Sequence, residues 1–176
     1  MSEWDKRFRR IEPWVGFAQV QKQFHSGGAF LVSVDKSGRP NAMTIGWGLL
    51  GTVWYQPVFL VLVRPSRYTH GCIVHSQAFT VNVPLGKMQK ELEFCGEKSG
   101  REVDKFKELG LRYEMGKEVA VPVLVDCDLI YECRVIGKVD LAPEEILSRE
   151  VREKYYPQGN LHTLFFGEIK AAWKAR

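Results

Sequence analysis

Residues 28–47, GAFLVSVDKSGRPNAMTIGW, decide how this chain folds. The run Gly28–Val34 is apolar and rich in β-branched residues, which is typical of a buried strand. Asp35-Lys-Ser-Gly38 then supplies residues that favour a turn, and Pro40–Trp47 continues as the returning strand. The stretch therefore predicts a β-hairpin whose second strand is polar, contains glycine and lies between hydrophobic neighbours.

Further strands and several helices are predicted around this hairpin. In Ala78–Val83 apolar residues alternate with Thr80 and Asn82, which predicts one buried and one polar face. Pro57 cannot donate a ladder hydrogen bond, so Gln56-Pro57 predicts a break or a sheet edge. The other predicted strands are Val53–Tyr55, Val58–Arg64, Leu124–Val139 and Leu161–Trp173, and the predicted helices are Thr69–Ser76, Lys87–Gly96, Val103–Leu109 and Pro143 to about Tyr155.

The strands come in clusters with helices inserted, rather than in regular alternation with helices. This order favours an antiparallel barrel with accessory helices, a mainly β fold, over a doubly wound parallel sheet. No linker, composition shift or repeat divides the chain, so we expect one domain over residues 1–176. A domain of this size buries roughly 70% of its unfolded surface and needs no disulfide or metal to stabilise its core.

The composition excludes several classes of protein. Apolar runs such as Val58–Val63 are far shorter than the ~20 residues of a membrane-spanning helix. The net charge of +4, from 25 basic and 21 acidic residues, is too slight to favour a nucleic-acid partner. The four cysteines form no CxxC pair, and no apolar signal segment follows Met1. We therefore expect a cytoplasmic protein with reduced cysteines and no membrane segment.

Familiar catalytic and cofactor motifs do not fit their surroundings in this sequence. Gly46–Gly51 matches GxGxxG, but the following Thr52–Pro57 is strand-like, whereas a dinucleotide fold requires a helix there. The four histidines show no metal-ligand spacing, and no GxSxG motif indicates a nucleophilic serine. The sequence does not favour a Rossmann, zinc or serine-hydrolase site.

The loop Arg64–Thr69 is the clearest candidate binding segment, because it contains two arginines and two hydroxyl side chains at the start of a predicted helix. A helix N-terminus offers amide donors and partial positive charge. Arg67 can add a bidentate guanidinium, and Ser66 and Thr69 can add hydroxyl donors. Together these groups suit a phosphate monoester. In the alternative, Ser66 or Thr69 only caps the helix and the arginines are solvated.

Five short motifs appear in order over roughly residues 14–173. They are Asn41-Ala-Met-Thr44 with Trp47, Arg67-x-Thr69, Phe79-Thr-Val-Asn82-Val, Cys95-Gly-x-x-Ser-Gly-x-x-x-Asp-Lys-Phe106 and His162-x-Leu-Phe-x-Gly167-Glu. In these motifs the chain resembles the flavin reductase-like, FMN-binding split-barrel family, and within it the flavoredoxin-type branch. The resemblance implies a split β-barrel homodimer with FMN at or near the subunit interface.

The same resemblance assigns roles to individual residues. The flavin ring would lie along a strand segment formed by Asn41, Ala42, Met43, Thr44, Ile45 and Trp47. The phosphate would be held by Arg67 and Thr69 together with Ser66 and Lys105, and Arg64 would also belong to the cofactor-binding set. Asn82 would reach the ribityl chain or the ring. His162 would lie where a nicotinamide stacks and is the candidate catalytic residue.

Three of the residues in these motifs also have purely structural interpretations. Trp47 can be ordinary barrel core, and His162 can simply hydrogen-bond the backbone at a strand start. Cys95 is better explained as a buried small hydrophobe than as a redox group, because no second cysteine is spaced to resolve a disulfide.

The resemblance implies an FMN-binding oxidoreductase that moves reducing equivalents between NADH or NADPH and FMN or a protein acceptor. The alternative is a flavoredoxin-type electron carrier with tightly bound FMN and no intrinsic NAD(P)H oxidation. A third possibility is a cofactor-binding or assembly protein that uses the same barrel. Because the redox chemistry would belong to the flavin, a chain without a triad or metal motif is expected.

Overall fold

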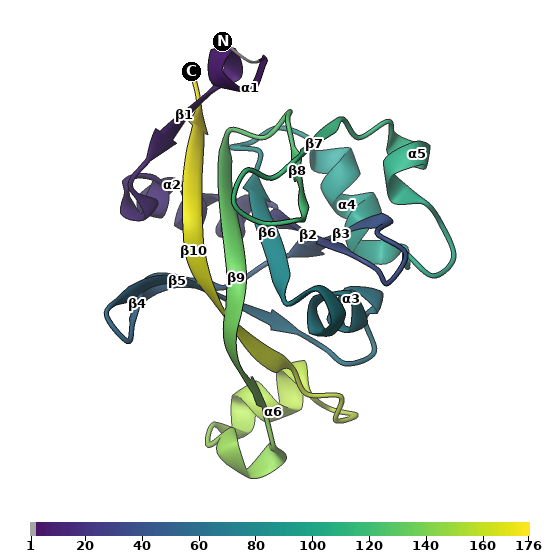
Figure 1. The fold of residues 1–176 in the computed structure, drawn as a ribbon. Helices are drawn as coiled ribbons and strands as arrows, with labels where there is room; N and C mark the ends of the chain where they lie inside the picture. Colours follow the sequence, from purple (N-terminus) through teal and green to yellow (C-terminus); the bar gives the residue numbers. More distant parts are fainter. Residues whose placement is uncertain (1–2) are drawn as a thin grey trace.

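The computed structural model describes residues 3–176 and is built around one eight-stranded antiparallel sheet (Figure 1). Its strands are β1 (Phe8–Ile11), β2 (Ala29–Val34), β3 (Pro40–Ile45), β4 (Leu49–Val53), β5 (Gln56–Val63), β6 (Ala78–Val83), β9 (Leu129–Asp140) and β10 (Thr163–Ala175). The strand order is β3-β2-β6-β9-β10-β5-β4, and β1 also pairs with β10. β3 and β4 end this order, although only residues 46–48 separate them in the chain. The sheet therefore curls into a barrel that is split between these two strands.

Helices and a second, two-stranded sheet cover the barrel. The helical segments are α1 (Glu3–Arg7), η1 (Pro13–Gly16), α2 (Phe17–Ser26), α3 (Tyr68–Ser76), α4 (Gln89–Glu97), α5 (Lys105–Leu109), η2 (Pro143–Glu145) and α6 (Arg149–Tyr155), and the second sheet pairs β7 (Tyr113–Met115) with β8 (Pro122–Leu124). α4 and α5 pack against β3, whereas α6 lies at the far end of β9 and β10 (Figure 1).

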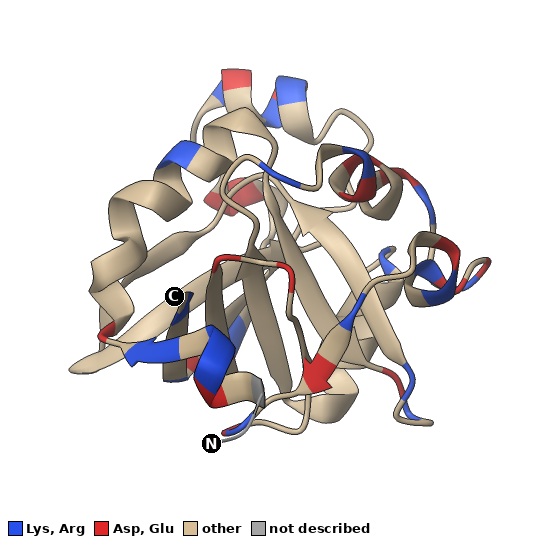
Figure 2. Cartoon of the chain, turned by 90° about the horizontal axis from the view of Figure 1, so that it is seen from above, with Lys and Arg blue, Asp and Glu red and all other residues tan. Residues whose placement is uncertain are grey.

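The mainly β fold with accessory helices is thus confirmed. Charged residues gather on the helices, turns and strand ends, while most of the central strand surface carries none (Figure 2). No helix within residues 3–176 is both long and apolar enough to cross a membrane.

Two apolar cores lie on opposite faces of the sheet. Inside the barrel, side chains such as Phe79 and Tyr131 are fully buried in one cluster. On the outer face, α4, α5 and β8 enclose a second cluster that includes Phe30 and Leu92. Strands between these cores, above all β6, are therefore buried on both faces.

The second face of β6 carries polar side chains as predicted, but it is buried, because β8 covers it. Thr80 Oγ1 donates a hydrogen bond to the carbonyl of Pro122 (2.6 Å), and Asn82 Nδ2 donates to Thr80 Oγ1 (2.9 Å). The amide of Leu124 donates to Asn82 Oδ1 (2.9 Å). Hydrogen bonding makes burial of these polar side chains tolerable. The apolar residues of the alternation face the barrel core, and the polar residues face the buried contact with β8.

The turn between β4 and β5 also differs from the prediction. Val53 pairs with Gln56, so the two-residue turn is Trp54-Tyr55, and Pro57 lies within β5 opposite Thr52. Trp54 and Tyr55 have φ values of 52° and 59°, as a type I′ hairpin requires. The sequence misled because Trp and Tyr favour strands, whereas such turns usually contain Asn or Gly.

The predicted strand Leu124–Val139 is divided, because β8 ends at Leu124 and β9 begins at Leu129, and β7 was not predicted. Further differences concern one helix and the start of the chain. The region predicted as one helix from Pro143 to about Tyr155 is divided into η2 and α6, and Ser148 Oγ caps α6 by accepting from the amide of Val151 (3.3 Å). The first 26 residues contain β1 and α2, which the sequence did not predict. β1 pairs with β10, which brings the first and last strands together.

Candidate functional site

Two adjoining cavities at the rim of the barrel contain nearly all the predicted site residues. The first, the α3 cavity, has a volume of about 310 Å³ and its lining includes Asn41, Met43, Ser66, Arg67, Thr69 and Lys105. The second, the β3 cavity, has a volume of about 210 Å³ and its lining includes Thr44, Ile45, Trp47, Arg64 and His162. Met43 and Arg67 line both cavities, so the two adjoin.

The N-terminus of α3 faces the α3 cavity without a capping side chain from the described residues. Arg67 is the N-cap residue and makes no side-chain capping bond. The Thr69 hydroxyl accepts instead from Asn41 Nδ2 (2.8 Å), and Ser66 Oγ accepts from Asn160 Nδ2 (2.8 Å). The alternative in which Ser66 or Thr69 caps the helix is therefore wrong. We call this feature the open N-terminus of α3; its amides and partial positive charge favour an anion.

Two cations of the α3 cavity are held in place by backbone carbonyls. Arg67 Nη2 donates to the carbonyl of Gly96 (2.9 Å). Lys105 is only 4% exposed, and its Nζ donates to the carbonyls of Ala42 (2.7 Å) and Cys95 (2.9 Å). Burial above all, and also the Arg67 guanidinium, lowers the pKa of Lys105. An ammonium has three N–H groups, so the third is left for a ligand, and an anion in the cavity would stabilise the charged form.

The β3 cavity follows one edge of β3. Among the described strands β3 pairs with β2 alone. The carbonyl of Ala42 points away from β2, to the unpaired edge of β3, where it accepts a hydrogen bond from Lys105 Nζ. Because backbone groups alternate along a strand, the amide of Thr44 lies on that same edge, while the Thr44 hydroxyl donates to the carbonyl of Leu92 (2.6 Å). This edge offers backbone donors to a flat ligand.

Trp47 lies at the mouth of the β3 cavity rather than in the barrel core, since it is 46% exposed. Its ring makes edge-on contacts with Tyr155 (5.5 Å between centroids) and His162 (5.9 Å). These rings form an aromatic wall on one side of the cavity, so the core interpretation of Trp47 is wrong.

His162 and Arg64 are tied to the segment that follows α6. His162 Nδ1 and the Tyr156 hydroxyl are 2.7 Å apart. Arg64 donates to the carbonyls of Asn160 (2.9 Å) and Tyr155 (2.7 Å), and its guanidinium lies 5.1 Å from the Tyr156 ring centre. Burial first, then Arg64 and Arg67, lowers the pKa of His162 to about 4. His162 is therefore neutral at pH 7, and its hydrogen bond is to a side chain rather than to the backbone.

The low pKa of His162 makes a prediction about stability. Between pH 6.5 and about 4 the unfolded chain binds a proton that folded His162 does not, so stability falls as the pH falls through this window. His162→Asn removes this titration and leaves that of His70. In chemical denaturation of the cofactor-free protein, the stability advantage of wild type over variant should shrink by up to about 3 kcal/mol from pH 7 to pH 4. Parallel pH profiles for the two proteins would contradict the assignment.

Asn82 and Cys95 do not belong to the reactive part of the site. Asn82 is fully buried and bonded to β8, outside the lining of both cavities. The structure therefore does not place Asn82 at either cavity, where the predicted contact with a ribityl chain or ring would require it. The Cys95 thiol is buried, and burial raises its pKa to about 11, which does not suit a reactive thiolate. All four cysteines are buried and free, and residues 3–176 contain no cluster suited to a metal ion.

Sequence reasoning missed the contribution of the segment before β10. Groups of this segment contact Arg64, Ser66 and His162, and the residues are Tyr155, Tyr156 and Asn160. The available signal was compositional, because two tyrosines and an Asn within six residues precede the singled-out His162. Their distance from Arg64 along the chain hid the contact.

The fold and the cavities define a split antiparallel barrel with an anion site next to a flat cleft. The chain belongs to the family described as the flavin reductase like domain, whose model matches residues 22–176. An uncharacterized protein of Archaeoglobus fulgidus is 32% identical over 132 residues, which are 74% of this chain and 63% of that protein. The chain thus spans less than two thirds of the length of this relative.

Several solved structures share the fold. Flavoredoxin of Desulfovibrio vulgaris (Miyazaki F) superposes with a TM-score of 0.68 at 25% identity, covering 85% of this chain and 69% of that one. Flavoredoxin from Methanosarcina acetivorans gives a TM-score of 0.65 at 28% identity, covering 84% and 68%. An FMN-binding protein from Thermus thermophilus gives 0.64 at 25% identity, covering 99% and 80%.

Proposed function

We propose that this chain binds FMN, with the phosphate in the α3 cavity and the flavin ring along the free edge of β3. One observation carries the proposal: the open N-terminus of α3, Arg67 and Lys105 converge on a cavity that adjoins the β3 cavity. This donor set fits a phosphate monoester. Together the cavities reach the range of roughly 300–1,000 Å³ typical of small-molecule sites. The FMN-binding and flavoredoxin names of the relatives support the same ligand.

FMN would supply hydride and single-electron transfer when bound. The protein's part is to bind and orient. Backbone donors on the β3 edge, such as the amide of Thr44, would favour negative charge on the carbonyl side of the ring. Trp47 and the neutral His162 would form the wall against which a nicotinamide can stack. Because His162 is neutral at pH 7, its role is to position the donor rather than to act as a charged acid.

The reaction we propose is transfer of reducing equivalents between NADH or NADPH and FMN, or onward to a protein acceptor. The test is anaerobic addition of each nicotinamide to the FMN-loaded protein while flavin absorbance is followed. Rapid bleaching, with turnover of excess FMN, is the expected result. A colourless purified protein that ignores added FMN would overturn the proposal.

The second candidate is an electron carrier with tightly bound FMN, which the flavoredoxin names of two structural relatives favour. In this case the flavin would bleach with dithionite or a reduced partner protein, but not with NADH or NADPH. The same absorbance experiment therefore separates the two candidates.

Replacing His162 with alanine should slow nicotinamide oxidation about tenfold or more while FMN stays bound, because the wall that orients the donor is lost. Pre-steady-state flavin reduction measures the rate, and fluorescence titration measures the FMN affinity. Tyr156→Phe is the matched companion, since it removes only the hydroxyl 2.7 Å from His162 Nδ1, and it should give a smaller slowing. An unchanged rate in His162→Ala would return His162 to a purely structural role.

We also propose that the chain forms a homodimer. Large apolar side chains are exposed on the β4–β5 hairpin and the neighbouring end of β9, including Leu49 (64%), Trp54 (63%) and Val139 (44%), and such patches often mark an interface. Leu49→Glu should yield monomers in size-exclusion chromatography with light scattering. Leu147→Glu, in the segment before α6, is the matched control and should leave the mass unchanged. Equal masses for both variants would contradict this interface.

A further inference from the structure

Tyr156 and His162 form a hydrogen-bonded pair beside the β3 cavity, and this pair leaves one ring nitrogen of His162 without a partner. His162 Nδ1 lies 2.7 Å from the Tyr156 hydroxyl, whereas Nε2 has no hydrogen-bond partner among residues 3–176. Nε2 is not enclosed by the protein either, because the described side-chain atoms that are both enclosed and unpartnered all belong to other residues. Nε2 is therefore open to the β3 cavity, which His162 lines.

The direction of this hydrogen bond fixes where the His162 ring carries its proton. In a neutral imidazole one nitrogen is a donor and the other an acceptor, and the bond made at one nitrogen decides the role of the other. A phenol O–H is a stronger acid than the N–H of neutral imidazole, and an unprotonated imidazole nitrogen is a stronger base than a phenol oxygen. Both differences favour donation from Tyr156 to Nδ1. The ring proton then lies on Nε2.

Arg64 favours the same direction. Its guanidinium lies 5.1 Å from the Tyr156 ring centre and donates to the carbonyls of Tyr155 (2.7 Å) and Asn160 (2.9 Å). A cation over a phenol ring draws electron density from the hydroxyl and makes it a better donor. Burial raises the pKa of Tyr156 although Arg64 opposes this, so the hydroxyl keeps its proton at pH 7. The low pKa of His162 keeps the ring neutral.

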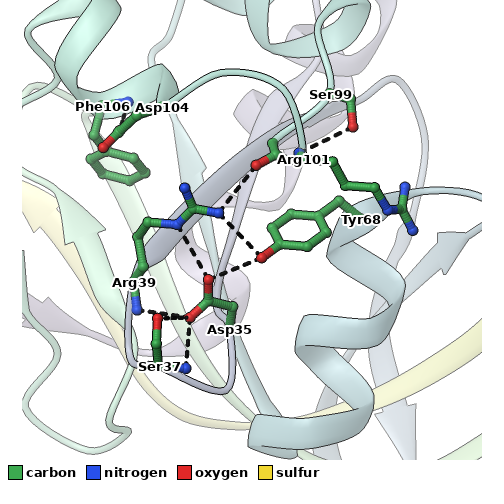
Figure 3. Close-up of polar contacts among 9 residues, drawn as sticks. Asp35, Ser37, Arg39, Tyr68, Ser99, Arg101, Asp104 and Phe106 are labelled. Carbon is green, nitrogen blue, oxygen red and sulfur yellow. Dashed lines mark hydrogen bonds and ion pairs between the residues drawn. The ribbon is translucent and has the colours of Figure 1, made fainter.

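Tyr68, which lines the α3 cavity, shows how a tyrosine hydroxyl is bonded where its role is structural (Figure 3). The Tyr68 hydroxyl donates to Asp35 Oδ2 (2.9 Å) and accepts from Arg39 Nη2 (3.3 Å), so the fold uses both of its capacities. The Tyr156 hydroxyl, in contrast, has His162 as its one partner among the described residues. The hydroxyl of Tyr156 therefore acts on the β3 cavity through His162.

We propose that Tyr156 is a positioning residue, which donates to His162 Nδ1 and so holds His162 in the tautomer that presents Nε2–H to the β3 cavity. This inference deepens the proposed function and rests on it, because the donor matters for catalysis only if the cavity holds a flavin and its reaction partner. The molecule that exchanges electrons with the flavin must then bring an acceptor, a carbonyl or carboxamide oxygen, to Nε2. A molecule that offers only donors at this point would leave Nε2–H unpaired, which costs binding free energy.

The tautomer can be measured by nitrogen NMR of isotope-labelled histidine side chains in the cofactor-free protein at pH 7. Loss of signals in His162→Gln identifies those of His162. Wild type should show a protonated Nε2 and an unprotonated Nδ1, and Tyr156→Phe should move part of the population to the Nδ1–H form. Tyr68→Phe is the matched control and should leave the His162 tautomer unchanged. A protonated Nδ1 in wild type, or identical His162 signals in wild type and Tyr156→Phe, would overturn the proposal.

Two replacements of His162 distinguish the ring positions during flavin reduction. The amide nitrogen of glutamine reaches the position of Nε2, and that of asparagine reaches the position of Nδ1. Relative to wild type, flavin reduction should slow by less than about threefold in His162→Gln and by about tenfold in His162→Asn, as expected for one lost hydrogen bond.

A double-mutant comparison shows whether Tyr156 acts through the imidazole. Tyr156→Phe should slow flavin reduction in the wild-type background and have no further effect in His162→Gln. Equal rates for His162→Gln and His162→Asn, or equal slowing by Tyr156→Phe in both backgrounds, would overturn the positioning role.

Failure of the flavin proposal would be recognised separately, because the tautomer measurement uses cofactor-free protein. A protonated Nε2 that depends on Tyr156, in a protein that ignores added FMN, would overturn the proposed function and leave the tautomer assignment standing. Rapid bleaching of bound flavin by a nicotinamide, in a protein whose His162 carries its proton on Nδ1, would overturn the tautomer assignment alone.

Discussion

Arg67→Ala is expected to weaken FMN binding about ten- to a hundredfold and to leave riboflavin binding almost unchanged. Arg67 lies at the N-cap of α3 and lines both the α3 and β3 cavities. Its charged hydrogen bonds to a phosphate are worth roughly 1.5–3 kcal/mol, and about 1.4 kcal/mol corresponds to tenfold in affinity. Riboflavin lacks the phosphate, so it does not use these bonds. Fluorescence titration of both flavins measures the two affinities.

Arg64→Ala is the matched control for this experiment. Arg64 lies three residues earlier, lines the β3 cavity and holds the carbonyls of Tyr155 and Asn160. Its loss should loosen the wall beside the ring and weaken FMN and riboflavin to the same degree. Equal weakening of both flavins in Arg67→Ala would mean that Arg67 only braces Gly96 and that the phosphate lies elsewhere.

The barrel could be predicted from the sequence where local signals and packing agree. The hairpin of β2 and β3 combines an apolar, β-branched run with a turn built on Asp35, whose carboxylate accepts from the amides of Ser37 (2.8 Å) and Arg39 (3.0 Å). Side-chain capping of this kind is local in sequence, so it can be predicted without knowledge of the tertiary fold. Gly110 ends α5 with a φ of 60° for the same reason.

Elements that depend on distant partners could not be predicted in this way. Thr80 and Asn82 are polar residues in a regular alternation, and only β8, some 40 residues later, shows that they are buried. The Trp54-Tyr55 turn carries strand-forming residues, and the pairing of β5 with β10 and β4 fixes the register against their preference. Tertiary contacts override local propensity at both places.

The candidate site divides along the same line. Arg67, Ser66 and Thr69 are close in sequence, so their common location before a helix could be predicted. The resemblance to a known family, rather than spacing, added Lys105 and His162, which the structure places at the same cavities. The resemblance also added Asn82, but the structure buries this side chain between β6 and β8, outside both cavities. Tyr156 and Asn160 were missed because only the path of the chain after α6 brings them to Arg64 and Ser66.

Lys105→Met is expected to lower the free energy of unfolding by about 2–4 kcal/mol, the largest stability effect we predict for a site residue. The Lys105 ammonium joins the carbonyl of Ala42 in β3 to that of Cys95 in α4. Methionine fills similar volume but leaves both buried acceptors without their donor, at roughly 1–3 kcal/mol each. Relief from burying a charge, which lowers the pKa of Lys105, offsets part of this cost. Urea denaturation measures the difference.

Lys107→Met, two residues along the same helix, is the matched control. Lys107 is exposed, and surface replacements of this kind usually change stability by less than about 0.5 kcal/mol. Equal midpoints for the two variants would contradict the bracing role of Lys105. Lys105 also lines the α3 cavity. Without denaturant, at a temperature where the variant is folded, Lys105→Met should therefore weaken FMN binding more than riboflavin binding. Both results together would show that Lys105 holds β3 against α4 and also completes the phosphate site. The same two hydrogen bonds that stabilise the fold would then fix the position of the ammonium that contacts the ligand.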